Sequence, residues 1–154
     1  MMDKRRQQLV ESIQTGIAAQ KTRHDVLRVA ARLIDGFSVD FNWTGFYLLE
    51  GNELVVGPYI GPPTPHTRIG LGQGLCGAAA TEKKTIIVDD VNADPRFLAC
   101  SITTRAEIVV PLMDGDQCLG EIDIDSNRPA AFTAADKEML EAVAAVMVDR
   151  LRML

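Results

Sequence analysis

Two alternating runs, residues 106–112 and 117–125, give the clearest pattern of apolar and polar positions in this chain. Apolar residues recur with a period of two, as in strands with one buried face. The segment Asp114-Gly115-Asp116 between the runs predicts a hairpin turn. A three-residue loop pairs Ile108 with Ile122, whereas a two-residue Asp-Gly turn mixes apolar and acidic residues on each face. We therefore expect the three-residue register.

The polar face of this predicted hairpin is acidic. Glu121, Asp123 and Asp125 share one face of the second run, and the expected register places Glu107 of the first run directly opposite Asp123. Like charges placed opposite each other repel, and acids on buried strands cost free energy unless a positive charge accompanies them. This face is either a solvated acidic surface or a site for a cation, which would be an ammonium group or a metal ion.

Helical periodicity and turn signals outline the remaining elements. Helices are expected at both ends of the chain, an N-terminal one over residues 3–20 and a C-terminal one within residues 133–154. Between them we expect a second helix, a first hairpin, a short helix and a short strand, at residues 22–33, 41–59, 74–81 and 85–88. This order predicts an α+β fold with helices on one face of an antiparallel sheet. The long segments 60–72 and 89–105 are expected to cover the other face, and loops of that length are usually functional.

Cysteine placement adds candidate chemistry. Cys76 lies at the start of the predicted short helix, where the helix dipole and free N–H groups favour a thiolate. Cys100 lies in an irregular segment shortly before the strand that carries Glu107, and the chain between the two cysteines is expected to be flexible enough for them to meet. Two buried, inert thiols are the alternative. Cys118 shares the apolar face with Gly120 and is expected to pack in the core.

Aromatic residues mark one more candidate site. Trp43 and Tyr47 share a strand face with Gly45 between them. Aromatic rings around such a gap form a small apolar or cation–π cage in some proteins, and pack as ordinary core in others.

Composition and charge limit the class of protein. A length of 154 residues suits a single domain, and a net charge of −5 without a Lys/Arg cluster argues against nucleic acid as a partner. No apolar run approaches the roughly 20 residues that a membrane span needs. The basic N-terminus lacks the apolar region of a signal peptide, so a cytoplasmic location with the cysteines as thiols is expected.

Several motifs together resemble one known family. They are Asn42-Trp-Thr-Gly-Phe-Tyr47, Gly74-Leu-Cys-Gly77, Leu98-Ala-Cys100, Arg105-Ala-Glu-Ile-Val-Val-Pro-Leu112 and Ile122-Asp-Ile-Asp-Ser126. In combination they are similar to the free methionine-(R)-sulfoxide reductases, which are single GAF-domain enzymes. The resemblance runs from about residue 25 to the C-terminus. It implies one GAF domain over residues 1–154, with an N-terminal helix in 1–21, an antiparallel sheet of about six strands, terminal helices on one face and a ligand pocket on the other.

The same resemblance implies a role for each matching residue. It makes Cys100 the catalytic thiol and Cys76 a second redox-active cysteine. It assigns the substrate's amino group to Glu107, Asp123 and Asp125, and its sulfoxide end to Trp43 and Tyr47. The implied activity is reduction of free L-methionine-(R)-sulfoxide through a sulfenic acid and then a disulfide that thioredoxin reduces. The family implies no cofactor or metal, and the terminal helices suit a homodimer.

Two positions depart from the family pattern. His66 stands where the family has a further cysteine that commonly resolves the sulfenic acid, and it is a candidate pocket residue. Ser101 follows Cys100 where the family usually has Asp. Cys76 is then the expected resolving cysteine. Two alternatives remain open: a GAF sensor that binds a small amino acid or amine without turnover, and a metal site formed by the three acids, with or without His66.

Overall fold

The computed structural model describes residues 2–99 and 101–154, so Met1 and Cys100 lie outside the described residues. Within those ranges, six strands form one antiparallel sheet in the order β3-β2-β1-β6-β5-β4. The strands are β1 (Trp43–Glu50), β2 (Glu53–Ile60), β3 (Arg68–Gly70), β4 (Ile86–Val88), β5 (Ala106–Asp114) and β6 (Gln117–Ser126). The α+β class and the antiparallel sheet expected from the sequence are confirmed.

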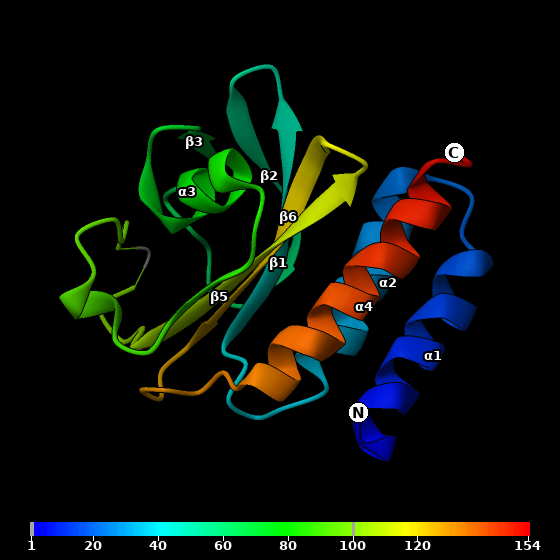
Figure 1. Cartoon of the computed structure of the whole chain (residues 1–154), viewed down its shortest axis with the longest axis horizontal. Coiled ribbons are helices and arrows are strands. Elements are labelled where there is room, and N and C mark those ends of the chain that lie inside the picture. Colours follow the sequence, from blue (N-terminus) through cyan, green and yellow to red (C-terminus); the bar gives the residue numbers. More distant parts are fainter. Residues whose placement is uncertain (1, 100) are drawn as a thin grey trace.

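Three helices lie on one face of the sheet, as Figure 1 shows: α1 (Lys4–Ala18), α2 (Arg23–Asp35) and α4 (Ala134–Leu151). Helices α2 and α4 pack on the strands, and α1 packs on both of these helices. The start of α4 is fixed by the predicted capping box, in which Thr133 and Asp136 each accept a hydrogen bond from the other's backbone N–H. The helix-forming periodicity therefore gave both terminal helices to within a few residues.

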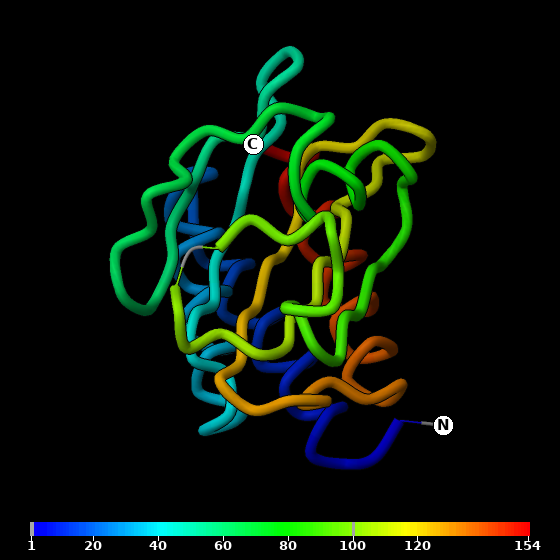
Figure 2. The backbone as a smooth tube through the Cα atoms, turned by 90° about the vertical axis from the view of Figure 1, so that its left-hand side faces the viewer, coloured from blue at the N-terminus to red at the C-terminus, as the bar shows by residue number. Residues whose placement is uncertain are grey.

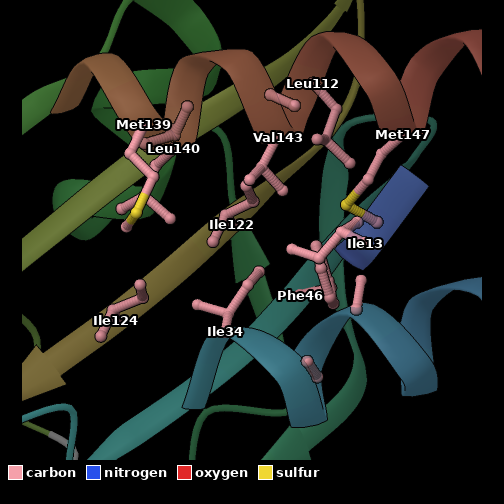
Figure 3. Packing of buried hydrophobic residues seen from close by; sticks show 14 of the residues in the cluster. Ile13, Ile34, Phe46, Leu112, Ile122, Ile124, Met139, Leu140, Val143 and Met147 are labelled. Carbon is pink, nitrogen blue, oxygen red and sulfur yellow. The ribbon is translucent and has the colours of Figure 1, made fainter. Parts of the chain in front are cut away.

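The main core lies between these helices and the sheet. Ile108, Ile122 and Ile124 point from β5 and β6 toward the helices, and each is fully buried. Figure 3 shows Ile122 and Phe46 facing Val143 of α4 and Ile34 of α2. Burial of such side chains contributes about 1.5–3 kcal/mol each, so this layer supplies most of the stabilisation.

The opposite face is covered by α3 (Gly74–Glu82) and by irregular segments. Figure 2, viewed from this side, shows segments 61–72 and 89–99 passing in front of the sheet. The first segment includes β3, which the sequence pattern did not indicate, and the second includes a 3-10 turn, Val91–Ala93. None of the helices in the described ranges combines the length and apolar character required to span a membrane.

Candidate active site

The acidic face of the β5–β6 hairpin is buried beneath α3, but its register differs from the expected one. Glu107 pairs with Asp125, and not with Asp123, which lies opposite Val109. The predicted three-residue loop was wrong: Asp114 pairs with Gln117, so the turn has only two residues between strand partners. Gly115 adopts a φ of 60°, which suits such a tight hairpin turn. The shift is two residues, so the division into an apolar and an acidic face is unchanged.

A β-bulge reconciles this short turn with the two faces. The register shifts between Leu112 and Met113, because Leu112 pairs with Gly120 while Met113 pairs with Cys118, which leaves Leu119 as the extra residue. The bulge also turns Cys118 away from its predicted side. Cys118 is buried, as expected for core packing, but in the cluster on the acidic face, while Leu119 packs toward the helices. The prediction that Cys118 shares the helix-facing side with Gly120 was therefore wrong.

Helix α3 brings Cys76 onto the acids. The Cys76 side chain is buried, and its thiol donates a hydrogen bond to Oδ2 of Asp123 over 3.5 Å. Burial raises the pKa of this thiol well above its usual value, and the charges of the surrounding acids, Asp123 first, raise it further. The expectation of a thiolate at Cys76 was wrong, because a helix terminus contributes only about 0.3–1 kcal/mol at exposed sites. Burial beside several carboxylates outweighs that contribution, so Cys76 is a protonated thiol.

The acids themselves are held in an unusual environment. Burial is the main cause that raises the pKa of Glu121, Asp123 and Asp125. Among the described residues no ion pair reaches these three acids. Both carboxylate oxygens of Glu121, and Oδ1 of Asp123 and Asp125, lack a hydrogen-bond partner within the described ranges. Such groups favour protonation or the entry of a cation.

Aromatic side chains from β1 and β2 lie next to these acids. Trp43 is opposite Asp125 in the β1–β6 pairing, and Tyr47 is opposite Glu121. The Trp43 ring stacks with the rings of both Tyr47 and Tyr59, with centroid separations of 6.2 and 5.0 Å. Gly45 permits this stack, since a Cβ there would lie 2.4 Å from Cβ of Tyr59 and 2.8 Å from the Trp43 ring. The aromatic and acidic parts of the predicted site are therefore adjacent.

Two loops close over this face through hydrogen bonds to the site residues. Trp43 Nε1 donates to the carbonyl of Pro62, and the Tyr47 hydroxyl donates to the carbonyl of His66. The His66 ring nitrogen Nε2 lies 3.2 Å from the carbonyl oxygen of Ala99. His66 thus joins the loop after β2 to the segment that precedes Cys100. The predicted catalytic residue Cys100 itself lies outside the described residues.

Two cavities are lined in part by the acids. One, of about 270 Å³, is lined by Trp43, Thr64, Ser101, Asp125 and other residues at the end of β6. The other, of about 10 Å³, is lined among others by Tyr47, Cys76, Glu107 and Asp123. The larger space suits a small organic molecule, whereas the smaller one holds about one water or ion. Since Glu107 pairs with Asp125, the two cavities lie on neighbouring parts of the sheet.

Two residues of this site were not singled out from the sequence. Glu121 shares the face of Asp123 by alternation and is completely buried. The sequence could have marked it as a site residue, because an acid on a buried strand is unusual. Tyr59 lies opposite Gly45 in the β1–β2 pairing. No pattern in the sequence indicates that Tyr59 stacks on Trp43, because this depends on the bulge between Gly45 and Tyr47.

Comparison with known proteins identifies the class of protein. The GAF domain family model matches residues 22–149. With the six-stranded antiparallel sheet of the described residues and its buried acidic face, the match shows that this chain belongs to the GAF domain family. The fold predicted from the sequence is confirmed.

Within this family, the chain is strongly similar to named enzymes. It is 44% identical over 111 residues to the free methionine-R-sulfoxide reductase of Saccharomyces cerevisiae, covering 70% of this chain and 61% of the relative. It is 39% identical over 106 residues to the enzyme of the same name from Escherichia coli, covering 69% and 64%. The matched segments span less than two thirds of each relative's length.

A solved structure gives the same result over nearly the whole chain. The X-ray structure of free methionine-R-sulfoxide reductase from Neisseria meningitidis in complex with its substrate has a TM-score of 0.92 and 34% identity. The match covers 99% of this chain and 92% of that one. The similarity therefore includes the helices and the loops over the acidic face as well as the sheet.

Proposed function

We propose that this protein reduces free L-methionine-(R)-sulfoxide to methionine. The observation that carries the proposal is the group of buried acids, Glu121, Asp123 and Asp125, whose raised pKa values and unpartnered oxygens favour a cation beside Trp43. The ammonium group of a free amino acid is such a cation, and a peptide-bound methionine does not carry one. The similarity to free methionine-R-sulfoxide reductases supports the same substrate.

The proposed binding mode assigns each end of the substrate to one part of the site. The ammonium group binds Glu107, Asp123 and Asp125, and the sulfoxide end lies against Trp43 and Tyr47. The cavity of about 270 Å³ beside Trp43 and Asp125 is the proposed entrance. Entry of one positive charge favours ionisation of the acids that bind it, because an opposite charge within a few ångströms lowers a carboxyl pKa.

The proposed chemistry uses two cysteines. The Cys100 sulfur attacks the sulfoxide sulfur, oxygen is transferred to Cys100 as a sulfenic acid, and methionine leaves. The Cys76 sulfur then attacks the sulfenic sulfur; a disulfide forms, and the hydroxyl leaves as water after taking up a proton. Because Cys76 is a protonated thiol, it must lose its proton in this step, and Asp123 Oδ2, at 3.5 Å, is the acceptor already in place. Thioredoxin dithiol reduces the disulfide and is itself oxidised.

A coupled assay tests this function. The protein is incubated with free L-methionine-(R)-sulfoxide, thioredoxin, thioredoxin reductase and NADPH, and the matched control is the Cys100→Ser variant. We expect NADPH loss only with the unmodified protein, and none with N-acetylated methionine sulfoxide, which has no ammonium group. Mass spectrometry after one turnover is expected to find a Cys76–Cys100 disulfide.

The alternative function, a sensor that binds a small amino acid without turnover, gives a different result in the same experiments. It predicts that calorimetry detects L-methionine binding while NADPH consumption does not exceed that of the Cys100→Ser control. We further propose a cytoplasmic, homodimeric protein, since thioredoxin-dependent turnover needs a reducing compartment and helices α1 and α4 pack together at one side. Light scattering coupled to size-exclusion chromatography measures the oligomeric state.

A further inference from the structure

The small cavity beneath α3 has a donor set that suits a metal ion. Three ligand atoms, one from each of Cys76, Glu107 and Asp123, lie within 4.8 Å of one another, and all three side chains are buried. Zn²⁺ binds thiolate at about 2.3 Å and carboxylate at about 2.0–2.2 Å, so tetrahedral ligand atoms lie roughly 3.4–3.6 Å apart.

The buried polar atoms next to this donor set provide an independent observation. Glu121 is completely buried, and neither of its carboxylate oxygens has a hydrogen-bond partner within the described residues. Oδ1 of Asp123 is also without one. Glu121 lies close to the Cys76 thiol, whose hydrogen bond nevertheless goes to Asp123. Buried acceptors without donors are the environment in which a cation is stabilised.

The size of the space favours an ion over an organic group at this point. The cavity lined by Cys76, Glu107 and Asp123 has a volume of about 10 Å³, which is about the space of one water. A single ammonium charge offsets one of the buried acids, whereas a divalent ion offsets two negative charges. A thiol combined with carboxylates suits a borderline ion such as Zn²⁺ or Co²⁺ better than Ca²⁺ or Mg²⁺, which prefer oxygen ligands only.

We propose that a divalent ion of the Zn²⁺ class binds to Cys76, Glu107 and Asp123, beside the buried carboxyl group of Glu121, and that it competes with the amino group of an amino acid. The ion acts as an inhibitor and not as a cofactor, since it occupies the thiol and two of the acids that the proposed reaction uses. The proposal does not depend on turnover.

Cobalt absorption tests the site directly. The full-length Cys100→Ser protein, reduced and freed of metal, is titrated with Co²⁺, and the sulfur-to-cobalt charge-transfer band in the near ultraviolet is recorded. We expect the band to saturate at about one equivalent and to be displaced by Zn²⁺, which binds such sites more tightly than Co²⁺. Adding Cys118→Ser, the matched control for a second buried thiol on the same face, is expected to leave the band unchanged. Adding Cys76→Ser is expected to remove it.

A second variant covers the case in which Cys76→Ser does not fold, as judged by far-ultraviolet circular dichroism. Glu121→Gln in the Cys100→Ser background is expected to weaken Co²⁺ binding about tenfold or more, as loss of a metal-site partner typically does. L-methionine, at concentrations that calorimetry shows to saturate the protein, is expected to weaken apparent Co²⁺ binding.

The proposal is overturned by absence of the charge-transfer band, by a band that persists without Cys76, or by unchanged Co²⁺ affinity in Glu121→Gln. Lack of competition by saturating L-methionine overturns the shared site. The reductase assay is repeated with a chelator present, so that its result does not depend on metal binding. The cobalt titration in turn uses a variant without Cys100, so that its result does not depend on turnover.

Discussion

The two faces of the β5–β6 hairpin differ although the same two strands form them. On the helix-facing side, Ile108 pairs with Ile124 and Val110 with Ile122, all of them buried among apolar side chains. On the other side, Glu107 pairs with Asp125, and Asp123 and Glu121 follow along β6. Both faces are almost completely removed from water, but only the first gains the full free energy of apolar burial.

This difference separates the residues that stabilise the fold from those that serve the site. An apolar side chain that fits the helix-facing core contributes stability without a specific polar partner, because the hydrophobic effect is not directional. A buried carboxyl costs stability until it is protonated or meets a cation. The acidic face therefore retains a capacity for binding that the helix-facing side does not have.

The largest expected effect comes from truncation on the helix-facing side. Ile122→Ala removes a completely buried side chain between the sheet and α4, and we expect the free energy of unfolding to fall by about 2–5 kcal/mol. Its neighbour in sequence, Glu121, points the other way. Glu121→Leu is expected to raise the free energy of unfolding by about 1–3 kcal/mol, since it removes unpartnered buried oxygens. Urea unfolding monitored by circular dichroism measures both.

Opposite signs for these adjacent positions are the test of the comparison. If Glu121→Leu destabilises the protein as strongly as Ile122→Ala, the acidic face contributes to stability in the same way as the apolar one, and the distinction is incorrect.

The next effect concerns binding. Asp125 lines the larger cavity and lies opposite Trp43. Asp125→Asn keeps the shape but removes the charge, and loss of a charge-assisted hydrogen bond of about 2 kcal/mol weakens binding of L-methionine about 30-fold. Calorimetry measures the affinity, with Asp40→Asn, an acid that pairs with Arg128, as the control. Equal affinity in Asp125→Asn and the unmodified protein contradicts the assignment of the ammonium group to this acid.

Alternation in the sequence was sufficient to predict the two faces of the hairpin, but not the register of its strands or the bulge. The apolar positions Ile108, Val110, Ile122 and Ile124 were all placed correctly. The register was wrong by two residues for two reasons: Asp114 pairs with Gln117 and is not part of the loop, and the bulge at Leu119 adds one further residue. The bulge leaves no mark in the apolar pattern, because leucine is compatible with either face. The side on which Cys118 lies depends on that bulge, so it could not be predicted.

The protonation state of Cys76 could not be predicted from the sequence either. Its place at the start of a helix is a local feature, and the local feature favours a thiolate. What decides its state is the packing of α3 onto Asp123, a contact between residues 47 positions apart. Likewise, β3 is only three residues long and is recognised by its pairing with Glu53–Val55, since a pattern of that length is not distinctive.

A smaller effect is expected at the edge of the acidic face, where close packing permits the aromatic stack. Gly45→Ala places a Cβ 2.4 Å from that of Tyr59, so the strands or the Trp43 ring must move, at a cost of about 1–3 kcal/mol. Gly57→Ala is the control, because its Cβ approaches only to 3.4 Å from the Phe46 carbonyl oxygen. Urea unfolding and the emission of Trp43 are expected to change only in the first variant. Unchanged emission in Gly45→Ala contradicts the close packing.

The smallest expected effect is the change in the free energy of unfolding per pH unit. Burial raises the folded-state pKa of Glu121 well above its unfolded value near 4.5, so the folded protein binds more protons than the unfolded chain between these two values. The stabilisation that comes from protonated Glu121 is complete below the unfolded-state pKa. It is lost as the pH rises through the folded-state pKa. In this window each buried acid lowers the free energy of unfolding by at most about 1.4 kcal/mol per pH unit.

Glu121→Leu isolates this contribution, because all other titrating groups are present in both proteins. Asp3 and Asp94, whose pKa values are lowered by hydrogen bonds to arginine, act in the opposite direction and cancel in the difference. We expect the stability gained by Glu121→Leu to be larger at pH 8 than at pH 5 in urea unfolding. A stability gain that is independent of pH would mean that Glu121 has the same affinity for its proton in the folded and unfolded protein. The destabilisation caused by Glu121 would then come from packing alone.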